Sequence, residues 1–243
     1  MRARRLVVLG ATAGVARAAH SLGCHTVFVQ QPRSPVEALV HDDSHLYSVD
    51  YTAATFAEFV DRVLRSLAPD AVVSVAASGL LPAAVANSVL GLSGTGIETV
   101  RRLREGRGAV SAEGRELDVV TFVTGGSHQL LAVVERHPVT ARMAPAGLPP
   151  AVAADVEEAV NGHLDEAGLR DGPARTTVTV ADGEVRVHGT LTHLGDGDQP
   201  ELVRRISGID VQRWSLGWPL GVRGTDCLET GTVSGTPHEG IAR

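Results

Sequence analysis

The sequence contains no lysine, and all 22 of its basic residues are arginine. This absence excludes a Walker-type phosphate lysine, a Schiff-base lysine and a lysine that acts as an acid or a base. Arginine can replace lysine as a phosphate clamp. The missing lysine therefore removes several enzyme classes but leaves anion binding open.

Cysteine and long apolar runs are also scarce. Cys24 and Cys227 are too few for a disulfide framework or a thiol metal site. No apolar run approaches the roughly 20 residues that span a bilayer, and the run from Leu6 to Leu9 is too short for a signal peptide. The net charge of −6 argues against nucleic acid as a partner. We expect a cytoplasmic protein with neither a membrane nor a nucleic-acid partner.

Strand and helix patterns alternate through residues 1–100. Short apolar runs predict strands at 6–9, 25–30, 45–49 and 71–75. Segments with helical periodicity lie between and after these runs, and they predict the longer helices at 53–67 and 79–90. Continuous apolar runs are typical of parallel strands that are covered on both faces. The alternation predicts a Rossmann-like α/β domain with a doubly wound parallel sheet.

The pattern changes after residue 100. Strand patterns at 116–124 and 129–135 flank Gly125-Gly126, and a second pair flanks Asp182-Gly183, which predicts antiparallel hairpins. A helix is expected at 151–167. We therefore expect an α+β region over 101–221, followed by a loose tail over 222–243 that is rich in glycine and threonine.

The most specific motifs lie in the C-terminal half. They are Gly168-Leu-Arg-Asp-Gly-Pro-Ala-Arg175 and, at a matching separation, Pro200-Glu-Leu-Val203 with Ser207-Gly-Ile-Asp210. Both resemble segments of the ATP-grasp carboxylate–amine ligases, namely Gly-Leu-x-x-Gly-Pro-x-His and Pro-x-Leu-x-x-x-x-(Thr/Ser)-Gly-Ile-Asp. The resemblance implies a pre-ATP-grasp domain of Rossmann type followed by the large ATP-grasp subdomain.

The departures from the family pattern concern ATP. The family has a small nucleotide-binding subdomain where this chain has only residues 105–115, which are too few for a compact domain. The resemblance also places the family's Mg²⁺-binding glutamates and asparagine at Thr177, Gly189 and Leu191, and a nearby arginine at His193. A hard cation requires oxygen ligands, chiefly carboxylates. We therefore expect a truncated relative that uses no ATP, no other cofactor and no metal.

A cleft between the two halves is the expected ligand site. The turn from Gly10 through Thr12 to Gly14 faces the carboxylate substrate in the resembling ligases, and Ser78-Gly79 follows the strand at 71–75. We expect these residues to bind a small carboxylate or amino-acid-like molecule, with Arg175 as a further contact. The same turn could hold a dinucleotide, but the incomplete glycine motif and the missing ribose carboxylate argue against it. A plain strand-to-helix turn remains open.

His188 and His193 are the candidate catalytic residues. Either could serve as an acid or a base, and together with Asp196 and Asp198 they could bind a transition metal. On one strand the two histidines would point to opposite faces because their numbers differ by an odd number. This argues against a shared metal ion and favours metal-free chemistry.

Three functions follow from the sequence. The favoured one is a degenerate ligase-like protein that binds a small carboxylate, an amino-acid-like molecule or a partner protein in the cleft. The first alternative is an ATP-independent hydrolase, lyase or isomerase that uses His188 or His193. The second is a non-catalytic subunit that docks onto a full-length ligase or pairs with itself, since loss of the subdomain should expose apolar surface.

Overall fold

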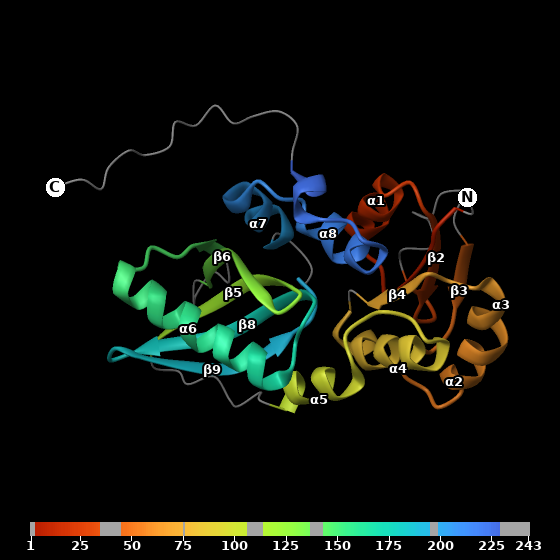
Figure 1. Cartoon of the computed structure of the whole chain (residues 1–243), viewed down its shortest axis with the longest axis horizontal. Coiled ribbons are helices and arrows are strands. Elements are labelled where there is room, and N and C mark those ends of the chain that lie inside the picture. Colours follow the sequence, from red (N-terminus) through yellow and green to blue (C-terminus); the bar gives the residue numbers. More distant parts are fainter. Residues whose placement is uncertain are drawn as a thin grey trace.

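The computed structural model describes residues 3–34, 45–74, 76–105, 114–136, 143–194 and 199–228. These residues form two sheets that lie at opposite ends of the long axis of the molecule (Figure 1). Sheet A belongs to the N-terminal half, and sheet B to the C-terminal half. The predicted fold class, a parallel α/β sheet followed by an antiparallel α+β region, is confirmed.

Sheet A has four parallel strands in the order β3-β2-β1-β4. They are β1 (Arg5–Leu9), β2 (His25–Gln30), β3 (His45–Ser48) and β4 (Ala71–Ser74). Leu6 and Val8 pack against α1 (Ala13–Ser21), whereas Val7 and Leu9 belong to the core on the opposite face. Both faces are therefore buried, which explains why the strands are continuously apolar.

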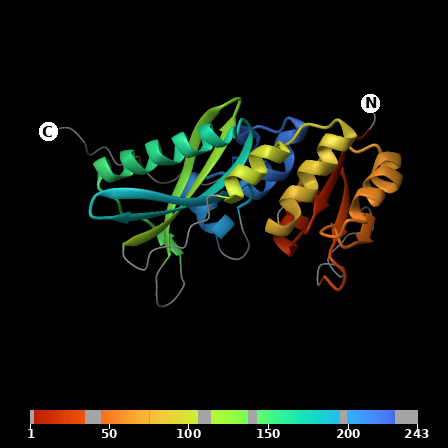
Figure 2. The same cartoon turned by 90° about the horizontal axis from the view of Figure 1, so that it is seen from below.

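Helices that precede and follow β4 in the chain cover the second face of sheet A (Figure 2). They are α2 (Phe56–Phe59), a π-helical segment (Val60–Leu64), α3 (Arg65–Leu67), a 3₁₀ turn (Ala77–Gly79) and α4 (Leu80–Leu90). Helix α4 ends where Gly91 adopts a left-handed conformation, as glycine readily does. The helix predicted at 53–67 begins at Phe56 and contains a π-helical segment. The spacing of its apolar residues along the sequence does not indicate this segment.

Sheet B is antiparallel, in the order β7-β6-β5-β8-β9. Its strands are β5 (Arg115–Thr124), β6 (Ser127–Arg136), β7 (Met143–Pro145), β8 (Gly172–Ala181) and β9 (Glu184–Leu191). The predicted hairpins are present, with positive φ angles at Gly125, Gly126, Asp182 and Gly183. Helix α6 (Pro150–Ala167) covers one face through Val156, Val160 and Leu164.

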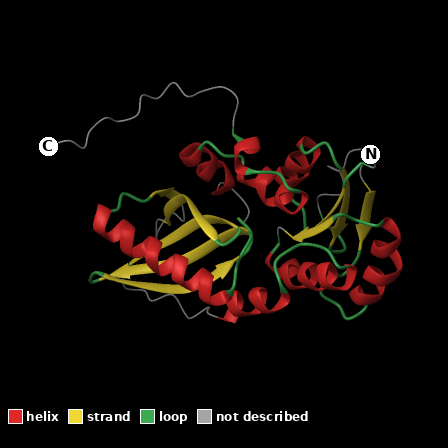
Figure 3. Ribbon diagram, viewed as in Figure 1, coloured by secondary structure: helices red, strands yellow, loops and turns green. Residues whose placement is uncertain are grey.

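Helical segments connect the two halves, as Figure 3 shows. They are α5 (Ile97–Glu105), α7 (Gln199–Ser207), α8 (Val211–Gly217) and a 3₁₀ turn (Trp218–Leu220). In α8, Leu216 packs in the core of α1 and sheet A. Trp214, from the same helix, stacks on Phe122 of sheet B with ring centroids 3.5 Å apart. A single short helix therefore contributes to the cores of both halves.

The predicted tail needs a correction at its start. Residues Gly224–Cys227 form a 3₁₀ turn, and the side chain of Cys227 is buried against sheet B and α8. The backbone carbonyl of Cys227 accepts a hydrogen bond from the backbone N–H of Asp210. These contacts bring residues 224–228 into the folded body, whereas the rest of the predicted tail, residues 229–243, lies outside the described residues.

Candidate functional site

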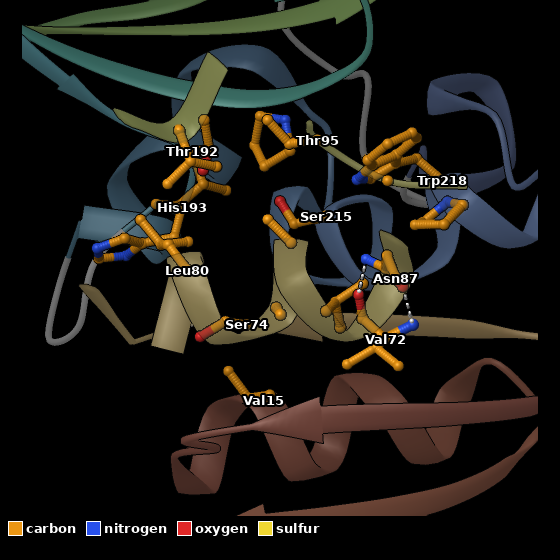
Figure 4. A pocket seen from close by; sticks show the side chains of 18 of the residues that line it. Val15, Val72, Ser74, Leu80, Asn87, Thr95, Thr192, His193, Ser215 and Trp218 are labelled. Carbon is orange, nitrogen blue, oxygen red and sulfur yellow. Dashed lines mark hydrogen bonds between the residues drawn. The ribbon is translucent and has the colours of Figure 1, made fainter. Parts of the chain in front are cut away.

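A small cavity lies between the two halves. It has a volume of about 60 Å³ and is bounded by α1, β4, α4, α5, the end of β9 and α8. We call it the buried cavity. Most of its wall is apolar, and its described polar lining residues are Ser74, Asn87, Thr95, Thr192, His193, Gln212, Ser215 and Trp218. Figure 4 shows Ser215 in the middle of the view, with His193 on one side and Trp218 on the other.

Asn87 closes the free edge of sheet A beside this cavity. Its amide oxygen accepts a hydrogen bond from the backbone N–H of Val72 at 3.1 Å, and its amide nitrogen donates to the carbonyl of Val72 at 2.7 Å (Figure 4). The side chain thus replaces a neighbouring strand for one residue of β4. A Cβ atom at residue 94 would lie 2.4 Å from the Asn87 amide nitrogen, so glycine is required there.

A wider, charged groove opens next to the cavity. It has a volume of about 520 Å³ and lies between the start of α1 and the start of α7; we call it the charged groove. Its charged lining residues are Arg17, Glu201, Arg204 and Asp210. Arg204 donates to Glu201 at 2.6 Å, and this contact lowers the pKa of the Glu201 carboxyl.

Gln212 connects the two sites because it lines both of them. Gly14 lies against this side chain, and a Cβ atom at residue 14 would approach the Gln212 amide oxygen to 3.0 Å. Thr12 begins α1 as its N-cap and accepts a hydrogen bond from the backbone N–H of Val15 at 3.4 Å. Thr12 and Gly14, which are both predicted to bind ligand, line the charged groove.

The other predicted turn residues line neither site. A Cβ atom at Gly10 would lie 2.6 Å from the Cβ of Ala76, and one at Gly79 would lie 2.4 Å from the Ser74 hydroxyl. Gly10 therefore permits the turn after β1 to approach Ala76, and Gly79 permits the 3₁₀ turn to approach β4. Ser78 is exposed on the 3₁₀ turn next to them.

The two predicted catalytic histidines occupy different environments. His188 lies at a bulge in β9, and its Nε2 is 2.7 Å from the Thr179 hydroxyl. His193 follows β9, which ends at Leu191, and it is buried in the wall of the cavity. The argument from alternating faces of one strand was therefore wrong, because the bulge and the strand end intervene. Asp196 and Asp198 lie outside the described residues.

A buried polar network lies on the face of sheet B that α6 leaves uncovered. Asp118 accepts hydrogen bonds from the Thr177 hydroxyl at 2.9 Å and from the Gln199 amide at 3.4 Å. The Gln199 oxygen accepts from the Arg175 guanidinium at 2.8 Å. Arg175, predicted to contact ligand, therefore bonds to the protein itself. Asp118 and Gln199 are not among the residues predicted from the sequence, although an aspartate between the two apolar strand residues Leu117 and Val119 is a signal.

Neither cysteine is a candidate nucleophile. Burial raises the pKa of the Cys24 thiol, against a smaller opposing effect of its contact with Thr26. Burial also raises the pKa of Cys227 to about 11. Both thiols are therefore protonated at neutral pH, and a protonated thiol is a poor nucleophile and metal ligand.

The comparisons with known proteins concern structure. Neither a family model nor a curated protein sequence matches the chain. An L-amino acid ligase from Bacillus licheniformis matches with a TM-score of 0.79 over 93% of this chain and 76% of that chain, at 16% identity. A phosphoribosylglycinamide synthetase from Anaerococcus prevotii matches with a TM-score of 0.75 over 91% and 76%, at 15% identity. The chain has the fold of the ATP-grasp ligases.

A third structure with this fold was determined with a nucleotide. It is the ADP complex of an N5-carboxyaminoimidazole ribonucleotide synthetase, with a TM-score of 0.65 over 94% of this chain and 77% of that one, at 9% identity. Identities this low establish the fold alone. The function has to be argued from the residues at the site.

In this ATP-grasp-like fold, the three positions that the resemblance assigns to metal ligands lie on β8 and β9. Thr177 donates its hydroxyl to Asp118, Gly189 pairs with Thr177 across the two strands, and Leu191 is buried beside Leu80 and Val100. Among the described residues, no group of three or more His, Cys, Asp or Glu side chains is placed to hold a metal ion. The described helices include none that is long and apolar enough to cross a membrane.

Proposed function

We propose that this chain is a catalytically degenerate ATP-grasp-like protein that does not use ATP and binds a small carboxylate or amino-acid-like molecule in the cleft between its halves. The observation that carries the proposal is the hydrogen-bond network of Asp118, Thr177, Gln199 and Arg175. It engages Thr177, one of the three positions that the resemblance assigns to metal ligands. Phosphoryl transfer depends on cations that neutralise the phosphates, and here protein groups bond to one another instead.

The connection between the halves supports the same proposal. Helix α5 ends at Glu105 and β5 begins at Arg115, so only residues 106–114 join them. A segment this short cannot form a compact subdomain of its own. Without a second subdomain, a nucleotide on sheet B would lack the contacts that position it for transfer.

The charged groove suits the proposed ligand. Arg17 offers a guanidinium group to a carboxylate, and the Thr12 hydroxyl lies at the start of α1, where the helix dipole favours negative charge. Asp210 offers a carboxylate to an amino group in the same groove, whereas Glu201 pairs with Arg204. Both signs of charge within one groove favour a zwitterion over a simple anion.

Thermal unfolding with small carboxylates tests this assignment. Acetate, succinate, glycine and L-alanine are compared with chloride at equal ionic strength, for the wild type and for Arg17→Gln. We expect at least one of them to raise the Tm of the wild type, and we expect the variant to lose that rise. Arg62→Gln is the control, because Arg62 pairs with Glu58 on an exposed helical surface away from the groove. The assignment fails if no ligand raises the Tm or if Arg17→Gln responds like the wild type.

One observation favours the second candidate, an ATP-independent enzyme. His193 is buried in a cavity wall that also carries the hydroxyls of Thr192 and Ser215. An imidazole in such a site can act as an acid or a base. If the protein turns over a substrate, His193→Gln should abolish turnover with the fold intact, whereas His188→Gln should retain it because His188 does not line the cavity. Equal losses in both variants would contradict a role specific to His193.

A further inference from the structure

We propose that the buried cavity is a binding subsite for a small uncharged group, such as a short amide or alcohol, and that it excludes carboxylates. The inference rests on the proposed function only in treating the cleft as a ligand site. It adds to that function by assigning different chemical groups of the ligand to the two ends of the cleft. The charged groove takes charged groups, and the cavity beyond Gln212 takes an uncharged one.

The chemistry of the wall argues for an uncharged occupant. No arginine, aspartate or glutamate is among the described residues that line the cavity, and His193 carries the one imidazole among them. The apolar lining includes Leu80, Ala84 and Val100, which form a buried core cluster. An ion that enters such a space loses its hydration without gaining a partner of opposite charge, which costs several kcal/mol or more.

Three polar side chains of the wall already bond to other groups of the protein. Both polar atoms of the Asn87 amide bond to Val72, and the Ser74 hydroxyl contacts the carbonyls of Leu9 and Ala76. The Ser215 hydroxyl donates to the carbonyl of Val211 at 2.6 Å. Its oxygen keeps a lone pair that can accept a hydrogen bond from a ligand N–H or O–H. The cavity thus suits a ligand that is mostly apolar and carries a hydrogen-bonding group.

The size of the cavity limits the ligand. A volume of about 60 Å³ holds a few water molecules or a group of a few non-hydrogen atoms. Trp218 forms one wall and also lines two neighbouring surface grooves. A Cβ atom at Gly172 would lie 3.2 Å from this indole, so glycine there lets the ring pack close to β8.

A pair of ligands of equal shape tests the proposal. Isobutyramide is uncharged, whereas isobutyrate has nearly the same shape and a negative charge. The chain has two tryptophans, so Trp214→Phe leaves Trp218 in the cavity wall as the only indole. We expect isobutyramide to change the Trp218 fluorescence saturably and isobutyrate to leave it unchanged. Trp218→Phe is the control, because Trp214 does not line the cavity and should report no saturable change.

A variant that fills the cavity completes the test. Ser215→Leu should abolish the isobutyramide response in the Trp214→Phe background, and Ser66→Leu, the same change on an exposed helix, should retain it. Ala84→Val is the smaller second variant if Ser215→Leu does not fold, and circular dichroism checks both. A folded filled variant that retains the response overturns the proposal, as does equal binding of the two ligands or a response to neither. None of these outcomes depends on Arg17, so the carboxylate test of the charged groove fails or succeeds separately.

Discussion

At the scale of single residues, the free edge of sheet A depends on Asn87. Its amide provides the donor and the acceptor that a fifth strand would otherwise supply to Val72. Buried backbone groups that lose their partners cost free energy. The role is specific to asparagine, because its planar amide presents a donor and an acceptor together at a side-chain length that reaches the backbone of Val72.

Asn87→Ala should therefore lower the free energy of unfolding by about 1–3 kcal/mol, because it leaves the N–H and carbonyl of Val72 buried without these partners. Urea denaturation followed by circular dichroism measures the change. Asn161→Ala on α6 is the matched control and should have little effect, since none of the hydrogen bonds described above involves Asn161. Equal effects of the two substitutions would contradict the assigned role.

His163 gives a pH dependence at the same scale. Burial lowers the pKa of its imidazole below the ordinary value of 6.5, against a smaller opposing effect of Glu166. The folded state therefore disfavours the protonated form. Above pH 6.5 this histidine costs no stability, and as the pH falls below that value the unfolded chain gains the proton first and stability is lost.

His163→Gln removes this titration. We expect the wild type to lose more stability than the variant between pH 7.5 and pH 5, because the other titrating groups are common to both proteins. Urea denaturation at the two pH values measures the difference between wild type and variant. A difference that stays the same at both pH values would show that His163 titrates alike in the folded and unfolded states.

At the scale of secondary structure, local patterns predicted most elements. The apolar run at β2 and the glycine that ends α4 agree with the structure, as do both hairpin turns. The misses share one cause. The π-helical turn in residues 60–64 and the bulge at His188 each insert an extra residue into the regular repeat of the helix or strand. Whether such a residue is inserted depends on packing against distant segments of the chain. A periodicity read along the chain contains no information about such contacts.

The candidate site was less predictable than the fold. Arg175 was expected to face a ligand, but it bonds to Gln199, the first residue of α7. Gln199 lies 24 residues away in the chain and approaches β8 only because α7 packs on sheet B. Thr12, Gly14 and His193 do line the cleft, because a turn after a parallel strand and the end of a strand both lie at sheet edges.

The network also makes a prediction at this scale. Gln199→Ala should lower the free energy of unfolding by about 1–3 kcal/mol, because it removes one buried partner from both Arg175 and Asp118. Gln129→Ala, the same change at an exposed position of β6, serves as the control and should change stability by less than about 0.5 kcal/mol. Chemical denaturation measures both, and a Gln199→Ala protein as stable as its control would show that the network contributes nothing.

At the scale of the whole molecule, the described residues form two halves with an ATP-grasp-like fold. Helix α8 holds them together through Leu216 on one side and Trp214 on the other. The cleft that remains has a charged groove and a buried cavity, which meet at Gln212. We propose that this arrangement binds a small ligand, and that the hydrogen bond from Thr177 to Asp118 occupies one of the positions that the resemblance assigns to the metal.

Isothermal titration calorimetry with Mg-ATP tests the central claim most directly. The protein is used at full length, after a cooperative unfolding transition has shown that it is folded. We predict no saturable heat up to millimolar nucleotide, because no group of three or more acidic, histidine or cysteine side chains among the described residues is placed to hold a metal ion, and residues 106–114 are too few for a nucleotide-binding subdomain. Saturable binding of one Mg-ATP per chain, lost on chelation of the magnesium, would contradict the account.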